Sequence, residues 1–343
     1  MQELSAYSIP LNECPVKLDG NESPFSLPEE ILYKVQEEIK KIPINRYPDP
    51  DATTIRTKIS NFTSFPQEGI LLGNGSDELI EMLLITFSGG TGKILFPVPT
   101  FSMFELMTIA LALEPLEVEL DERFDIDIKE TLKVLKDKNP DLIFIASPNN
   151  PTGNCFSEEK IIEIIMNSKG IVVLDEAYGD FSGKTFLNLI DKHENLIILR
   201  TMSKVGFAGI RLGILFGNAE LVKEINKVRL PFNINSLSQG IANVILDNLS
   251  FVRENVQLIT TERERVYNSI KILSGVEAFS SDANFILFRV DNADRIFKEL
   301  IDKGILIRNF NSPGRLENCL RVTIGKPEEN EAFIEGLNQI ISS

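Results

Sequence analysis

Short apolar runs alternate with amphipathic segments along the first two thirds of the chain. The runs cover residues 93–96, 142–146, 171–174, 196–199 and 212–216, and helical spacing of apolar positions marks residues 102–113 and 157–168. Continuous apolar runs of this length are typical of strands that are buried on both faces. Strands that alternate with amphipathic helices form a mostly parallel sheet. The pattern therefore predicts an α/β fold with helices on both faces of the sheet.

From about residue 235 the pattern changes to longer helices, followed by strand-like runs at 283–290, 304–310 and 319–325. This mixture predicts a smaller α+β domain. The first residues are extended and rich in proline, with one amphipathic helix over 27–41. We expect three parts: an N-terminal arm and helix over 1–44 that packs on the smaller domain, a large domain over 45–235, and the small domain over 236–343.

Charge and composition narrow the classes of function. The chain has 343 residues and a net charge of −15, which opposes binding to nucleic acid or to an anionic membrane. No apolar run approaches the roughly 18 residues of a membrane span, and no signal peptide is evident. Three cysteines without metal-ligand spacing indicate reduced thiols and a cytoplasmic location. With a single histidine, His193, acid–base chemistry falls to lysine, carboxylates or tyrosine.

Four apolar runs end in polar or aromatic residues. Thr100 and Phe101 follow the first run, Asn150 the second, Asp175 and Tyr178 the third, and Lys204 the fourth. The carboxyl ends of parallel strands meet at one edge of a sheet, where such folds build ligand sites. An aromatic ring, an amide, a carboxylate, a phenol and an amine are thus expected in one crevice.

The stretch "RTMSKVGFAGIRLG", residues 200–213, surrounds Lys204 with small, apolar and hydroxyl side chains. The next charge is Arg211, and Gly206 and Gly209 lie between, where they would let the backbone approach a ligand closely. A lysine in such a setting can react through its unprotonated amine. Taken alone, the stretch favours a salt-bridged or solvated lysine.

A glycine-rich turn, "GNGSDE" at residues 73–78, joins a strand to a helix whose expected N-cap is Ser76. The free amides at such a helix start can bind phosphate. An ordinary capped helix is the alternative.

Asp175 also fits the magnesium-binding strand of phosphate-loop nucleotide hydrolases. The nearest partner motif, "SGGTGKI" at 88–94, has Phe87 where the first glycine should stand and Ile94 where a hydroxyl should bind magnesium. We therefore exclude a nucleotide hydrolase and expect no metal. A turn residue at the end of a strand remains an alternative for Asp175 and for Asn150.

Taken together and in this order, "GNGSDE", "PTF", "SPNNPTG", "DEAY" and "RTMSKVGFAGIRLG" resemble the fold-type-I aminotransferases that use pyridoxal 5'-phosphate. The segments "LDGNESPF", "NRYPDP", "RLPFNINSLSQ" and "CLRVTIG" are similar to the histidinol-phosphate aminotransferase family. The resemblance runs from about Lys17 to the end. It implies a large domain with a mostly parallel seven-stranded sheet between helices, a smaller α+β domain and a homodimer.

The resemblance also implies roles for the clustered residues. Lys204 would form a Schiff base with the cofactor aldehyde and afterwards carry a proton to and from the substrate. Asp175 would keep the cofactor's pyridine nitrogen protonated. The remaining cofactor ring contacts implied are Phe101 on the ring face, with Asn150 and Tyr178 on its phenolic oxygen.

The cofactor phosphate would be bound by Gly75, Ser76, Asp77, Ser203 and Arg211, with Thr201 beside them and Tyr47 reaching from a second subunit. Arg308 and Arg321 match the family's arginines that bind the anionic end of the substrate, and Asn21 is a further substrate contact. For both arginines, a place on an exposed sheet face is the alternative.

Two positions depart from the family pattern. The link from Lys204 to Arg211 is one residue shorter than in many relatives, which leaves its path open. Phe232 stands where tyrosine is frequent, which removes a polar contact expected near the substrate.

Three functions follow. The first is transamination between L-histidinol phosphate and 2-oxoglutarate, giving imidazole acetol phosphate and glutamate, with aromatic amino acid transamination as its close variant. The second is a lyase resembling threonine-phosphate decarboxylase. The third is a ligand-binding module without catalysis, which the retained Lys204 disfavours.

Overall fold

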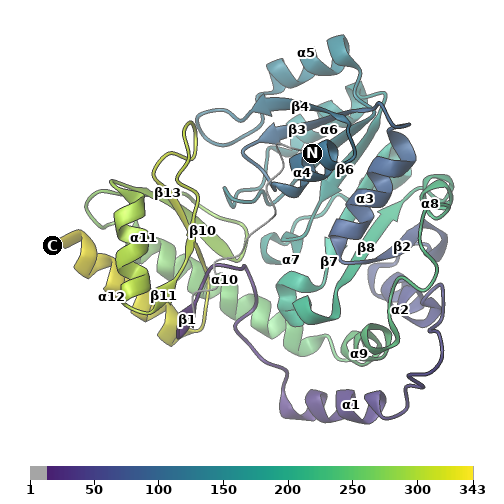
Figure 1. Ribbon diagram of the computed structural model, residues 1–343, viewed down its shortest axis with the longest axis horizontal. Coiled ribbons are helices and arrows are strands. Elements are labelled where there is room, and N and C mark those ends of the chain that lie inside the picture. Colours follow the sequence, from purple (N-terminus) through teal and green to yellow (C-terminus); the bar gives the residue numbers. More distant parts are fainter. Residues whose placement is uncertain (1–13, 343) are drawn as a thin grey trace.

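A seven-stranded sheet forms the centre of the structure, a computed structural model that describes residues 14–342 (Figure 1). Its strands, in spatial order, are β2 (Ile70–Asn74), β8 (Leu212–Gly217), β7 (Leu196–Thr201), β6 (Ile171–Asp175), β5 (Leu142–Ala146), β3 (Lys93–Val98) and β4 (Glu114–Glu119). The five from β7 to β4 run parallel, whereas β8 is antiparallel to both of its neighbours. The predicted mostly parallel sheet is confirmed.

Alternating side chains send each central strand's apolar residues to two separate clusters. In β5, Ile143 and Ile145 join the cluster on one face, and Leu142 and Phe144 join the cluster on the other. One face is covered by α3 (Ser76–Phe87), α4 (Met103–Ala110) and α8 (Ala219–Ile225). The opposite face is covered by α2 (Thr53–Thr63), α5 (Ile128–Lys138), α6 (Glu158–Asn167), α7 (Gly179–Ser182), α9 (Ser236–Leu246) and α10 (Ser250–Ile270).

A second sheet lies in the C-terminal part of the chain. Its four antiparallel strands, in spatial order, are β12 (Arg308–Asn309), β13 (Cys319–Thr323), β10 (Phe285–Val290) and β9 (Val276–Ala278). Helices α11 (Ala293–Asp302) and α12 (Pro327–Ser342) lie beside it (Figure 1). This is the predicted smaller α+β part, and the register places Arg308 directly opposite Arg321.

The N-terminal segment connects the two sheets. Strand β1 (Val16–Lys17) pairs with β11 (Ile305–Leu306), and α1 (Glu29–Ile39) packs on α9 at the lower edge of the molecule (Figure 1). Short helical turns η1 (Gln67–Gly69), η2 (Leu187–Lys192), η3 (Ser203–Phe207) and η4 (Ala208–Ile210) complete the elements. Residues 1–13 of the predicted arm lie outside the described part, and the three domain boundaries stay predictions.

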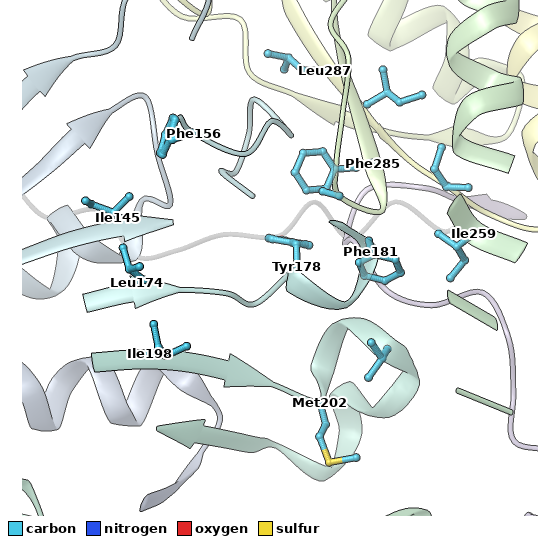
Figure 2. Packing of buried hydrophobic residues seen from close by; sticks show 14 of the residues in the cluster. Ile145, Phe156, Leu174, Tyr178, Phe181, Ile198, Met202, Ile259, Phe285 and Leu287 are labelled. Carbon is cyan, nitrogen blue, oxygen red and sulfur yellow. The ribbon is translucent and has the colours of Figure 1, made fainter. Parts of the chain in front are cut away.

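One apolar cluster continues from the large sheet to the small one. Ile145, Leu174 and Ile198 occupy matching positions on β5, β6 and β7; Tyr178 lies between them and Phe285 of β10, and Phe181 lies on the far side of Tyr178 (Figure 2). The rings of Tyr178 and Phe285 meet edge to face, with centroids 5.1 Å apart. This packing fixes the small sheet over the carboxyl edge of the large one. Within residues 14–342, no helix has the length and apolar composition of a membrane span.

Candidate active site

A cavity of about 290 Å³ lies at the carboxyl edge of the parallel strands. Every predicted site residue except Gly75 and Tyr47 lines it: Asn21, Ser76, Asp77, Phe101, Asn150, Asp175, Tyr178, Thr201, Ser203, Lys204, Arg211, Arg308 and Arg321. The expected convergence of strand ends is therefore confirmed, because β3, β5, β6 and β7 are neighbours in the sheet. His193 does not line the cavity. Among residues 14–342, no three histidine, cysteine or acidic side chains are grouped as a metal site requires.

Asp175, the last residue of β6, places a buried carboxyl at the base of the cavity. Its Oδ1 accepts a hydrogen bond from the backbone N–H of Ala177 at 2.9 Å. Burial raises the pKa of the Asp175 carboxyl to about 7, and the negative charge of Asp77 adds to the effect. Lys204 acts in the opposite direction. A carboxyl of this kind ionises readily only when a cationic group is placed against it.

The next carboxylate along the chain, Glu176, is held on the other side of β6. Its Oε2 accepts hydrogen bonds from Nε and Nη2 of Arg200 at 3.1 and 2.9 Å, and its Oε1 accepts the backbone N–H of Phe186 at 2.7 Å. Arg200 lies near the end of the adjacent strand β7. The pair fastens the strand ends that carry Asp175 and Lys204, and it compensates a second buried negative charge.

Lys204 lies in the turn η3, directly after β7. Thr201 Oγ1 donates to Ser203 Oγ at 2.9 Å, which fixes the backbone immediately before the lysine. The amine lies 5.6 Å from the ring centroid of Tyr178. Chain direction then reverses through η4, and Arg211 adopts a left-handed conformation with φ of 50°. The shortened link from Lys204 to Arg211 therefore runs through η3 and η4.

The glycines of this link do not act as expected. Neither Gly206 nor Gly209 lines the cavity, and open space surrounds the position of a Cβ on Gly209. Gly206 has a φ of 113°, a conformation that side-chain-bearing residues rarely adopt. The expectation that both glycines let the backbone approach a ligand is wrong. Gly206 is explained by the turn.

The glycine-rich turn places helix α3 with its first residues at the cavity. The helix begins at Ser76, and Gly75 is its N-cap, so the predicted Ser76 cap is wrong by one residue. The reason is that Gly75 has a φ of 82°, outside the helical range. Arg211 Nη2 lies 3.0 Å from Asp77 Oδ2, which holds a cation beside the helix start. The backbone N–H groups of the first turn have no partner within a helix, so they can bind an anion here.

Gly213 allows this turn to pack closely on β8. A Cβ placed on Gly213 would lie 2.6 Å from the carbonyl oxygen of Gly75 and 2.6 Å from the backbone nitrogen of Ser76. Both contacts are with backbone, which cannot move away as a flexible side chain can. A methyl group at residue 213 must therefore displace the turn.

We expect Gly213→Ala to weaken the binding of a phosphate-bearing cofactor by at least about tenfold, which corresponds to about 1.4 kcal/mol. Equilibrium titration of the cofactor-free protein measures the change. Gly209→Ala is the matched control, because the space around residue 209 is open. Unchanged affinity in Gly213→Ala would contradict the role given to this close contact.

The polar groups of Tyr178 and Asn150, which also line the cavity, are both hydrogen-bonded. Asn21 Nδ2 donates to the Tyr178 hydroxyl at 2.8 Å, and Thr323 Oγ1 donates to Asn21 Oδ1 at 3.0 Å. Asn150 Oδ1 accepts a hydrogen bond from Arg321 Nη1. Phe101 meets Phe104 edge to face and turns its ring toward the cavity lining.

Arg321 is buried, with 6% of its surface exposed, and two aromatic rings enclose it. Its guanidinium carbon lies 5.0 Å from the ring centroid of Phe285 and 5.1 Å from that of Phe310. Nη2 donates to the Asp19 carbonyl at 2.7 Å. An exposed sheet face is therefore excluded for Arg321, while Arg308 beside it is partly exposed. The arginines give the cavity a cationic wall that suits an anionic ligand.

Several cavity residues were missed, among them Lys17, Asp19 and Phe310. Lys17 Nζ lies 3.3 Å from Asp19 Oδ1 and 2.9 Å from Glu22 Oε2. The signal for the first two was present in "KLDGNE", because Asp19 lies inside the family motif "LDGNESPF" and Lys17 directly before it. Nothing in the sequence indicated Phe310, because its role depends on a contact with Arg321, eleven positions further along the chain.

Tyr47 does not reach the cavity of its own chain. Its surface is 81% exposed, and its ring stacks on Phe232 with centroids 4.4 Å apart. Phe232 does not line the cavity either. Within one chain, phenylalanine in place of tyrosine at this position therefore removes no polar group from the cavity. That Tyr47 binds the cofactor phosphate of a second subunit stays a prediction.

Comparisons with known proteins agree with this geometry. A family model described as aminotransferase class I and II matches residues 14–337. A protein of Aquifex aeolicus named histidinol-phosphate aminotransferase is 44% identical over 100% of this chain and 97% of its own length. The crystal structure of the histidinol-phosphate aminotransferase from Clostridium acetobutylicum is 27% identical, covers 95% of this chain and 99% of its own, and has a TM-score of 0.87. A Sinorhizobium meliloti structure of that name, in complex with pyridoxal 5'-phosphate, shares the fold at 21% identity, covering 96% of this chain and 92% of its own, with a TM-score of 0.88.

Proposed function

Because the chain belongs to the class I and II aminotransferase family, we propose that it transfers the amino group of L-histidinol phosphate to 2-oxoglutarate, with pyridoxal 5'-phosphate as its cofactor. This reaction is a step of histidine biosynthesis. One observation carries the proposal: a single cavity combines a lysine, a buried carboxyl, a helix start and two arginines. The full-length similarity to histidinol-phosphate aminotransferases supports the choice of substrate.

The residues of the cavity fit the proposed cofactor. The start of α3, Arg211 and the hydroxyls of Thr201 and Ser203 form a phosphate site, and the Phe101 ring offers a face for stacking. The carboxyl of Asp175, buried and reluctant to ionise, calls for a cationic partner such as a protonated pyridine nitrogen. Tyr178 and Asn150 would bind the oxygen on the ring. When bound, the cofactor supplies an electron sink for the charge left on the substrate's α-carbon.

Lys204 has two tasks in this proposal. Its amine would hold the cofactor through the cofactor's aldehyde between turnovers. Once the substrate's amino group replaced it there, the free amine would serve as the base that takes the proton from the substrate's α-carbon and as the acid that returns a proton. The hydrogen-bonded Thr201 and Ser203 hold the turn in place during both tasks.

Arg321 and Arg308 would bind the anionic end of each substrate, the phosphate of histidinol phosphate or a carboxylate of 2-oxoglutarate. Burial strengthens such a contact, because water does not compete with the ligand. Asn150 and the Asp19 carbonyl already orient the Arg321 guanidinium.

We expect Arg321→Gln to lower kcat/KM for both substrates by about 10- to 100-fold, the range expected for the loss of a charge-assisted contact. Steady-state kinetics with each substrate varied in turn measures the change. Arg289→Gln is the matched control: Arg289 lies in the same small sheet, pairs with Glu277 at 2.5 Å and does not line the cavity. Equal losses in the two variants would contradict the role of Arg321.

The proposal includes a homodimer in which Tyr47 reaches the cofactor phosphate of the other subunit. Large apolar side chains are exposed near Tyr47 and its stacking partner Phe232 in the sequence, with Ile44 86% and Leu230 70% exposed. Mixing Lys204→Ala and Tyr47→Phe subunits tests the arrangement. A mixed dimer then contains one complete site only if Tyr47 serves its partner, so recovered activity supports the proposal and no recovery contradicts it.

The proposed location is the cytoplasm, which the three free cysteines Cys14, Cys155 and Cys319 support.

Coupled turnover with histidinol phosphate and 2-oxoglutarate tests the substrate assignment. We expect glutamate to form only when both substrates are present. Turnover with an aromatic amino acid but not with histidinol phosphate would reject this specificity. Release of carbon dioxide without any keto acid would indicate a lyase instead. A purified protein that binds no pyridoxal phosphate would overturn the proposal as a whole.

A further inference from the structure

Two segments on the surface hold each other beside the helix start of α3. The Tyr47 ring stacks on the Phe232 ring at a centroid distance of 4.4 Å and an interplanar angle of 15°. Arg229 Nη1 donates to the Pro50 carbonyl at 2.6 Å, and Nη2 donates to Asp51 Oδ1 at 2.9 Å. Residues 229–233 therefore fix residues 47–51, although Tyr47 itself is exposed.

The side chain of Asn233 joins these segments to the turn that precedes α3. Its Oδ1 accepts from Arg229 Nη1 at 3.2 Å, and its Nδ2 donates to Glu78 Oε2 at 2.7 Å and to the Leu72 carbonyl at 3.1 Å. The same Glu78 oxygen accepts the backbone N–H of Asn74 at 2.6 Å. One amide group thus links the Tyr47 segment to the backbone directly before Gly75.

The backbone next to Asn233 is held in an unfavourable conformation. Phe232 has a φ of 62°, in the left-handed region, which is uncommon for a bulky side chain. Such a conformation persists only where the surrounding contacts determine it, and it is often found near functional sites. Here the contacts are the ring stack on one side and the Asn233 hydrogen bonds on the other.

We propose that Asn233 is a positioning residue for the cofactor phosphate in both subunits. Within its own chain it acts through Glu78 and Asn74 on the turn of Gly75, Ser76 and Asp77. For the site of the partner subunit, it acts through Arg229 and Phe232 of its own chain, which hold Tyr47 in position. The inference rests on the proposed function, because it requires the phosphate at this turn.

This role predicts that Asn233 affects how the cofactor phosphate is bound but not how the cofactor ring is bound. Asn233 does not line the cavity and touches neither Lys204 nor the residues expected around the cofactor ring. Its loss should therefore weaken binding of the phosphate and leave binding of the ring and aldehyde unchanged. Pyridoxal separates the two contributions, since it has the same ring and aldehyde as the cofactor but no phosphate.

The experiment titrates the cofactor-free full chain with pyridoxal 5'-phosphate and, separately, with pyridoxal, following ligand absorbance. We expect Asn233→Ala to raise the Kd for pyridoxal 5'-phosphate at least tenfold and that for pyridoxal less than twofold. Glu78→Gln, which keeps the side-chain volume but removes the shared charge, should change the same ratio in the same direction by about three- to tenfold. This second variant keeps the test decisive if Asn233→Ala fails to fold.

Asn167→Ala is the matched control. Asn167 is exposed on α6, where its Nδ2 donates to the Glu163 carbonyl at 2.8 Å, and it is no partner of Arg229, Glu78 or Leu72, so the ratio of the two Kd values should match the wild type. Equal weakening of both ligands in Asn233→Ala, or no change in either, overturns the positioning role. A wild-type chain that does not prefer pyridoxal 5'-phosphate over pyridoxal overturns the proposed phosphate site itself, and this inference with it.

Discussion

Replacing Lys204 with alanine is expected to lower kcat at least about 1,000-fold, since the change removes both a covalent anchor and a general acid–base group. Among the described residues that line the cavity, no other amine is placed to take over. Lys17 is the other lysine along the described lining of the cavity, and Asp19 and Glu22 already hold it at the rim. Single-turnover measurement of amino-group transfer gives the loss directly. An added small amine such as methylamine should restore part of the proton-transfer rate.

Lys223→Ala is the matched control for this experiment, because Lys223 is an exposed lysine on α8 outside the cavity. We expect wild-type turnover from it. A Lys204→Ala enzyme that keeps more than about a tenth of the wild-type kcat would contradict the assignment of Lys204 as the reacting amine.

Replacing Asp175 with asparagine should have opposite effects on activity and on stability. The neutral amide cannot hold a proton on the cofactor's pyridine nitrogen, so we expect kcat to fall by about 100-fold or more, the size typical of a lost electrostatic contact at a reacting group. Steady-state turnover and the pH dependence of the bound cofactor's absorbance measure the loss. Activity equal to that of the wild type would contradict the role of Asp175.

The stability effect follows from the raised pKa of the Asp175 carboxyl, about 7 in the folded chain against an ordinary value of 3.8. Between these values the folded state binds more protons than the unfolded state, so the free energy of unfolding decreases as pH rises from about 4 to about 7. At pH 8 the buried charge costs on the order of 4 kcal/mol in the cofactor-free protein.

Asp175→Asn should therefore raise the melting temperature of the cofactor-free protein by roughly several degrees at pH 8. The gain should shrink as the pH is lowered toward about 4, where the carboxyl is increasingly protonated in both states. Calorimetry across this pH range measures it. Asp137→Asn makes the same chemical change on an exposed face of α5 and should shift the melting temperature little at any pH. A gain that does not depend on pH would contradict the explanation by burial of charge.

The strands, and the crevice at their carboxyl ends, could be predicted from the sequence. Asp175 directly follows an apolar run and Lys204 lies a few residues after another, and parallel strands necessarily bring their carboxyl ends to one edge. The rule needs no knowledge of distant contacts. For this reason the cluster of strand-end residues could be predicted correctly, and the seven-stranded sheet followed from the resemblance.

Details that depend on backbone conformation or on distant partners could not be predicted in this way. The start of α3 was misplaced because the φ of 82° at Gly75 is imposed by packing on β8, which a local capping pattern does not reveal. The aromatic surroundings of Arg321 come from Phe285 and Phe310, which its own sequence neighbourhood does not contain. Gly206 was expected to let the backbone approach a ligand, but it is the positive φ of the turn that requires a glycine there.

The antiparallel strand β8 has a consequence for how this enzyme can change in evolution. Thr201 of β7 pairs with Gly213 of β8, so the segment that carries Lys204 and Arg211 is the loop of a hairpin whose two ends are fixed in the sheet. The free energy of closing a loop changes little with each added residue. A residue gained or lost inside the hairpin can therefore be absorbed by η3 and η4 while both anchored ends stay in place. The length of the lysine loop is free to drift in a lineage without moving the lysine away from the proposed phosphate site.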